Sequence, residues 1–84
     1  MQEEKDIEFY IRQIKLITNM SEREGVLTIL EINEFIHDKN INILEALDEY
    51  VKYLRMCTIP VNEVNKINQG FLENLNQMII EGVY

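Results

Sequence analysis

The fold is decided by two stretches of sequence, NILEALDEYV at residues 42–51 and IPVNEV at residues 59–64. The first predicts a capped amphipathic helix, because an asparagine precedes glutamate by three residues and apolar residues follow at helical spacing. The second predicts the start of another helix, since proline suits a first turn and the residue before it is pushed out of the helical region. We therefore expect one helix to end near Met56 and a short helix to begin at Pro60.

The N-terminal half has the same helical periodicity. Isoleucines and aromatic residues recur at helical spacing over residues 3–18, which predicts a first helix with acidic residues in its first turn. Ser21 and Glu24 then form a capping-box pattern that predicts a second helix running to about His37. Gly25 should weaken the start of that helix by ~1 kcal/mol relative to alanine.

The C-terminal part is predicted to hold two short helices. Gln69 and Gly70 are expected to break the helix that begins at Pro60, and a last helix should run from Phe71 to about Glu81, with Gly82 as its stop. Every predicted helix has an apolar face, and no stretch alternates as a strand would. The sequence therefore predicts an all-α fold, a compact bundle of four to five short helices in a single domain spanning residues 1–84.

Composition and charge narrow the function classes. The 84 residues are 46% hydrophobic and 27% charged, which is ordinary for a folded domain. The net charge is −7, and acidic residues outnumber basic ones in both halves of the chain. Because no basic stripe is present to neutralise phosphates, direct nucleic-acid binding is disfavoured. No apolar run approaches the ~20 residues of a membrane span, and the N-terminus lacks the pattern of a signal peptide.

The residues that commonly carry chemistry are scarce. His37 is the only histidine and Cys57 the only cysteine, so neither has a partner for metal binding or nucleophilic catalysis. We expect His37 at the surface near a helix end and Cys57 as a small buried residue. The lone cysteine also excludes an intramolecular disulfide and favours a reducing, cytoplasmic compartment. The sequence thus predicts no catalytic residue, no metal and no cofactor, and a protein that is not an enzyme.

The helix predicted over residues 43–56 is apolar around more than half of its circumference. In so small a domain, two explanations are open: the other helices surround this helix completely, or part of its face forms a groove for a helix of another protein. The sequence alone does not choose between them.

Three segments in order carry a resemblance to a known family: INILEALDEY at residues 41–50, IPVNEVNKI at residues 59–67 and GFLENL at residues 70–75. In type and spacing they resemble the late-transcription coactivator family of T-even-type bacteriophages, over about residues 31–80. The resemblance implies a phage-encoded transcription regulator that binds the flap of the host RNA polymerase β subunit through an apolar groove, without contacting DNA itself. Members also connect the polymerase to the phage sliding clamp through a C-terminal tail. Here residues 78–84 leave no separate tail beyond the last predicted helix, so flap binding is the part that we expect to hold.

The hypothesis places the partner-binding groove on the 43–56 helix and the helices that follow it. The residues expected to line this groove are Leu47, Tyr50, Val51, Leu54, Val64, Ile67, Leu72 and Leu75. Two alternatives remain open. One is a small acidic inhibitor that occludes a nucleic-acid-binding host enzyme, and the other is a helical module that forms a homodimer through its excess apolar face.

Overall fold

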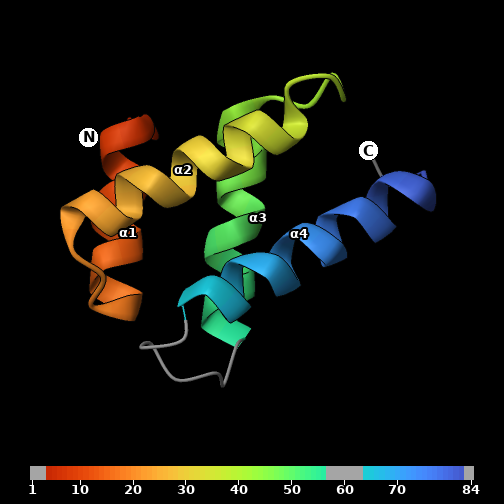
Figure 1. Cartoon of the computed structure of the whole chain (residues 1–84). Helices are drawn as coiled ribbons and strands as arrows, with labels where there is room; N and C mark the ends of the chain where they lie inside the picture. Colours follow the sequence, from red (N-terminus) through yellow and green to blue (C-terminus); the bar gives the residue numbers. More distant parts are fainter. Residues whose placement is uncertain (1–3, 57–63, 83–84) are drawn as a thin grey trace.

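The computed structural model describes residues 4–56 and 64–82 of the chain, apart from the side chain of Val64. These residues form four α-helices and no strand, which confirms the predicted all-α class (Figure 1). The helices are α1 (Ile7–Thr18), α2 (Glu22–Ile36), α3 (Ile43–Met56) and α4 (Val64–Ile80). Two predictions lie outside the described residues: the helix start at Pro60 and the buried position of Cys57.

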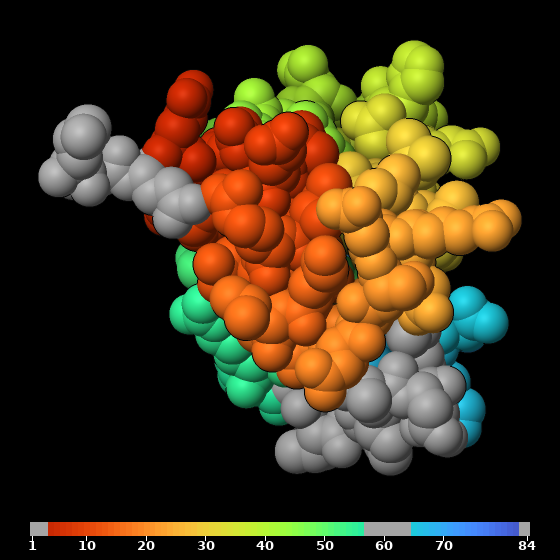
Figure 2. All heavy atoms as spheres, turned by 90° about the vertical axis from the view of Figure 1, so that its left-hand side faces the viewer, coloured from red at the N-terminus to blue at the C-terminus, as the bar shows by residue number. Residues whose placement is uncertain are grey.

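The helices pack as two crossed pairs, α1 with α3 and α2 with α4. In Figure 1, α1 and α3 run side by side, α2 passes across both of them, and α4 packs against α2 and α3. Figure 2 shows the same arrangement from the side of α1, with α2 at the surface. Helix α3 is therefore in contact with all three other helices, and the core lies around it.

Side-chain caps set where three helices begin. The carboxylate of Asp6 accepts a hydrogen bond from the Phe9 amide at 2.9 Å, and the Ser21 hydroxyl accepts one from the Glu24 amide at 3.2 Å. The Asn42 side chain accepts one from the Leu44 amide at 2.8 Å. The predicted caps of α2 and α3 are thus confirmed. The predicted start of α1 near residue 3 is wrong: residues 4–6 are not helical, and the Asp6 cap on the Phe9 amide begins the helix at Ile7.

A single helix replaces the two that were predicted at the C-terminus. Helix α4 continues through Gly70, so the expected break at Gln69-Gly70 is wrong. A Cβ atom on Gly70 would lie 2.5 Å from the hydroxyl oxygen of Tyr53, which shows that glycine lets α3 and α4 approach closely. The helix cost of one glycine is ~1 kcal/mol, less than the gain from burying Ile67, Phe71 and other apolar residues of α4. Helix α4 ends at Ile80, and Gly82, at φ 78°, follows it as the predicted stop.

The core combines apolar packing with a chain of buried hydrogen bonds. The Tyr50 hydroxyl donates to Oδ1 of Asn68 at 2.7 Å, and Nδ2 of Asn68 donates to the Thr28 hydroxyl at 3.1 Å. The three side chains come from α3, α4 and α2, and all are buried. Next to them, the rings of Tyr50 and Phe71 meet edge to face with centroids 5.0 Å apart, and the ring centroid of Tyr53 lies 5.7 Å from that of Phe71. These contacts fix α2, α3 and α4 relative to one another.

The two helical glycines should respond differently to alanine. A Cβ on Gly25 would meet Ile14 at 4.0 Å, an ordinary contact, so Gly25→Ala should raise the free energy of unfolding by about 0.5–1 kcal/mol. Gly70→Ala should gain less or destabilise, because the Tyr53 hydroxyl has to move. In a Tyr53→Phe background Gly70→Ala should become favourable. Urea denaturation of the four variants measures this, and equal gains from both glycines in the wild type would contradict the close approach.

The hydrogen-bond chain should show a non-additive response to mutation. Tyr50→Phe or Thr28→Val leaves one polar group of Asn68 buried without its partner, and each should cost about 1–3 kcal/mol. The triple variant Tyr50→Phe/Asn68→Leu/Thr28→Val removes the unsatisfied groups together and should cost less than the sum of the single changes. Denaturation midpoints with unchanged m-values test this, and strictly additive losses would contradict it.

Candidate functional site

A shallow groove of about 570 Å³ lies on the surface between α2 and α4. The residues that line it are Glu31 and Phe35 from α2 with Asn65, Gln69, Leu72, Glu73 and Asn76 from α4. On α4 these residues recur every three to four positions and therefore follow one face of the helix for about three turns. The groove is long enough along α4 to receive one side of another helix.

Phe35 and Leu72 supply the apolar part of the groove, and both are half-buried. Next to the groove, the Lys39 ammonium group lies 4.4 Å from the centroid of the Phe35 ring and donates a hydrogen bond to the Phe35 carbonyl at 2.9 Å. Lys39 also donates to Asp38 at 3.1 Å, and this hydrogen bond holds the pKa of the Asp38 carboxyl below its usual value. Phe35 is thus held in place by a neighbouring cation while its ring still borders the groove.

The charges that line the groove are of one sign. Glu31 lies on the α2 side and Glu73 on the α4 side, and both are exposed. The lining residues include no lysine or arginine. An apolar strip between two carboxylates is complementary to a helix with apolar anchors flanked by basic residues.

The structure places the predicted partner-binding residues mainly in the core. Six of them are buried by the chain's own helices: Leu47, Tyr50, Val51, Leu54, Ile67 and Leu75. Leu72 is half-buried and borders the α2–α4 groove, and the side chain of Val64 lies outside the described residues. The expectation of an exposed groove along the 43–56 helix is therefore corrected. Contact of the six buried residues with a partner stays a prediction that would require the core to open.

The physical reason for this correction is the central position of α3. A helix that touches three neighbours needs apolar residues around most of its circumference, which is the pattern that the sequence shows. The sequence left open whether the other helices surround α3 or whether part of its face forms a groove. The described residues support the first explanation. The same burial means that a seam of the kind that the homodimer alternative requires would have to lie elsewhere than on the buried face of α3.

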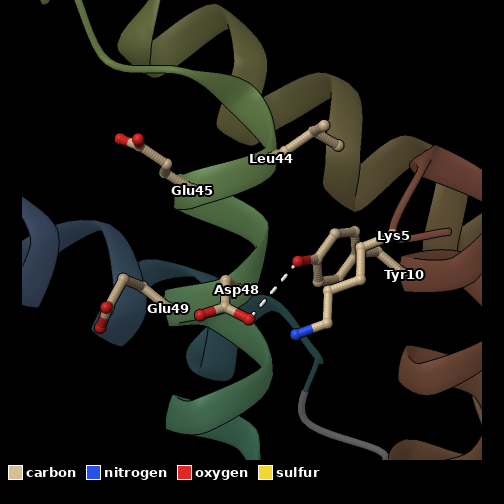
Figure 3. A pocket seen from close by; sticks show the side chains of 6 residues that line it. All are labelled: Lys5, Tyr10, Leu44, Glu45, Asp48 and Glu49. Atoms are coloured by element: carbon tan, nitrogen blue, oxygen red, sulfur yellow. Dashed lines mark hydrogen bonds between the residues drawn. The ribbon is translucent and has the colours of Figure 1, made fainter. Parts of the chain in front are cut away.

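A second pocket, of about 410 Å³, lies between the start of α1 and the first half of α3 (Figure 3). Tyr10 and Lys5 lie on one side of α3, whereas the side chains of Glu45 and Glu49 extend from α3 on the other side. The Tyr10 hydroxyl donates to Asp48 at 3.4 Å. Burial raises the pKa of the Tyr10 phenol above its ordinary value, and the nearby Asp48 carboxylate raises it further.

Lys52 lies one turn beyond this pocket and pairs with two of the carboxylates that line it, Asp48 and Glu49. Its ammonium nitrogen lies 3.3 Å from Oδ2 of Asp48 and 3.5 Å from Oε1 of Glu49. The hydrogen bond to Asp48 and the charge of Glu49 raise the pKa of Lys52. Two of the three carboxylates on this face of α3 are thus paired, which gives little support to a continuous acidic surface of the kind that the inhibitor alternative requires.

Of the two residues considered for chemistry, His37 and Cys57, only His37 lies among the residues that the structure describes. His37 lies at the surface as the C-terminal cap of α2, as predicted. Among the described residues, no group of three or more His, Cys, Asp or Glu side chains is arranged to hold a metal ion. In the same part of the chain, no helix combines the length and apolar character needed to cross a membrane.

Sequence reasoning missed two surface features. The groove was missed because it is formed by polar and apolar residues of two helices that are distant in the chain, and only Phe35 and Leu72 have the apolar character that a pattern search detects. The second feature is the exposure of Leu27 and Leu30 on α2, at 53% and 56% of their surfaces. The apolar residues of α2 divide between an inner and an outer face, which helical spacing alone does not show.

Comparison with protein-family models, curated proteins and solved structures finds no significant match to this chain.

The raised pKa of Tyr10 predicts a loss of stability at alkaline pH. Because the pKa is higher in the folded state than in the unfolded state, the contribution of Tyr10 is complete below about pH 10 and is lost as pH rises through the folded value. The difference in unfolding free energy between wild type and Tyr10→Phe should therefore be constant up to about pH 9 and then shift against the wild type. Urea denaturation across this range measures it. The other tyrosines are present in both proteins, so a constant difference at every pH would contradict the prediction.

Proposed function

We propose that this chain is a protein-binding adaptor that receives an amphipathic helix, with basic residues beside its apolar anchors, in the groove between α2 and α4. The groove itself is the observation that carries the proposal, since it combines an apolar strip with carboxylates on both sides. Leu72 and Phe35 would contact the apolar anchors, and Glu31 and Glu73 would pair with the basic residues.

The resemblance over residues 31–80 supplies the candidate partner. We propose the flap of the host RNA polymerase β subunit, which makes the chain a phage-encoded regulator of late transcription. The net charge of −7 supports a role that leaves DNA contact to other proteins. The groove is on a different face from the one first expected, because α4 contributes Leu72 and Glu73 to it whereas the predicted α3 residues are buried.

Binding to purified RNA polymerase with and without the flap tip tests the partner. The wild-type chain should retain the intact polymerase and lose the polymerase that lacks the flap tip. Equal recovery of the two would rule out the flap as the binding site. Binding that persists as salt rises would favour apolar contacts in the groove, whereas complete loss by about 200 mM salt would favour the electrostatic alternative.

Charge reversal tests the groove without disturbing the core. Glu31→Lys/Glu73→Lys changes two exposed residues and should weaken polymerase binding on the order of tenfold or more, because like charges would meet. Glu81→Lys, a control that makes the same charge change at an exposed residue outside the groove lining, should leave binding within about twofold. Titration by surface plasmon resonance measures both, and equal losses from the two variants would reject the groove. Circular dichroism should show the same helical content in each.

A further inference from the structure

The outer face of α2 carries an apolar stripe that no part of the described chain covers. Leu27 and Leu30 are more than half exposed, and Val26 beside them is 38% exposed. Figures 1 and 2 agree that α2 lies on the outside of the molecule. This stripe is separate from the α2–α4 groove, which is bordered on α2 by Glu31 and Phe35.

The stripe lies directly opposite the buried face of the helix. At 100° per residue, Arg23, Leu27, Leu30 and Glu34 fall within an arc of about 60°, and the buried residues of α2 lie on the other side. The four residues span about 16 Å along the helix axis. Two leucines therefore occupy the centre of the stripe, with a basic residue at one end and an acidic residue at the other.

The order of charges makes this stripe complementary to itself. Arg23 precedes Leu27 by four positions, and Glu34 follows Leu30 by four positions. If a second α2 helix packs antiparallel with the same centre, Leu27 faces Leu30 of the second copy and Arg23 faces Glu34. A two-fold axis repeats each contact, so the pairing forms two leucine contacts and two ion pairs. Within the described residues, no ion pair with a side chain of the same molecule involves Arg23 or Glu34.

We propose that α2 is a homodimerisation helix, which pairs antiparallel with α2 of a second copy through Leu27 and Leu30. A parallel arrangement about a two-fold axis would place Arg23 against Arg23 and Glu34 against Glu34, and repulsion excludes it. One exposed helix face is a small interface, so the dimer forms and dissociates reversibly with concentration. The proposal does not depend on the polymerase-binding function, because it uses a different face of α2.

Reversing the charges one at a time and then together tests this register. Sedimentation equilibrium at a series of concentrations should show a monomer–dimer equilibrium for the wild type. R23E and E34R should each raise the dissociation constant on the order of tenfold, because each replaces two attractive pairs by two repulsive ones. The double variant R23E/E34R restores opposite charges in the same register and should dimerise as the wild type does. A mixture of R23E and E34R should form heterodimers in preference to either homodimer.

Two further variants test whether the apolar stripe of α2 acts independently of the fold and of the α2–α4 groove. L27S/L30S should abolish dimerisation while circular dichroism shows unchanged helical content, since both leucines are exposed. The groove variant E31K/E73K should leave the dimer intact. A wild-type chain that remains monomeric at every concentration would overturn the proposal, and so would a double variant that fails to restore the dimer. A wild-type chain that dimerises but does not bind polymerase would show that the proposed function has failed. A wild-type chain that binds polymerase but stays monomeric would show that the dimer proposal has failed.

Discussion

The buried hydrogen bonds from Tyr50 to Asn68 and from Asn68 to Thr28 are the interaction on which the arrangement of three helices depends. Apolar contacts alone would tolerate some sliding of α2 and α4 over α3, because dispersion has little directionality. An amide that donates on one side and accepts on the other fixes both neighbours at once, since a shift would leave a polar group buried without a partner. The register of the three helices is therefore set at one point.

The hydrogen bonds of Asn68 also determine the shape of the proposed binding surface. Thr28 and Asn68 join α2 to α4 directly, and the groove opens beyond them along both helices. Glu31 lies about one turn after Thr28, and Leu72 lies one turn after Asn68. The same bond that closes the core thus holds the two walls of the groove at a constant separation. A preformed groove of this kind binds with a smaller loss of conformational entropy than a surface that must rearrange.

Local signals predicted much of the fold, and contacts distant in sequence account for the rest. The caps at Ser21 and Asn42 were correctly predicted because a capping hydrogen bond depends on residues only two or three positions apart. The break at Gly70 was wrong because glycine has the same local preference whether it ends a helix or admits the ring of Tyr53. The binding groove was misplaced for a related reason: periodicity shows that α3 is broadly apolar, but it does not show how many neighbours cover it. Among the predicted site residues whose side chains the structure describes, Leu72 alone lies at the groove.

The aromatic contacts around Phe71 give the protein a useful spectroscopic property. The chain contains no tryptophan, so its near-ultraviolet circular dichroism arises mainly from four tyrosines and three phenylalanines. Tyr50 and Tyr53 are held on α3 against a ring of α4, in an asymmetric and rigid environment. The near-ultraviolet signal therefore reports the docking of the last helix, whereas the far-ultraviolet signal reports helix content. An intermediate in which α4 remains helical but detached would lose the part of the first signal that arises at Phe71 and keep the second.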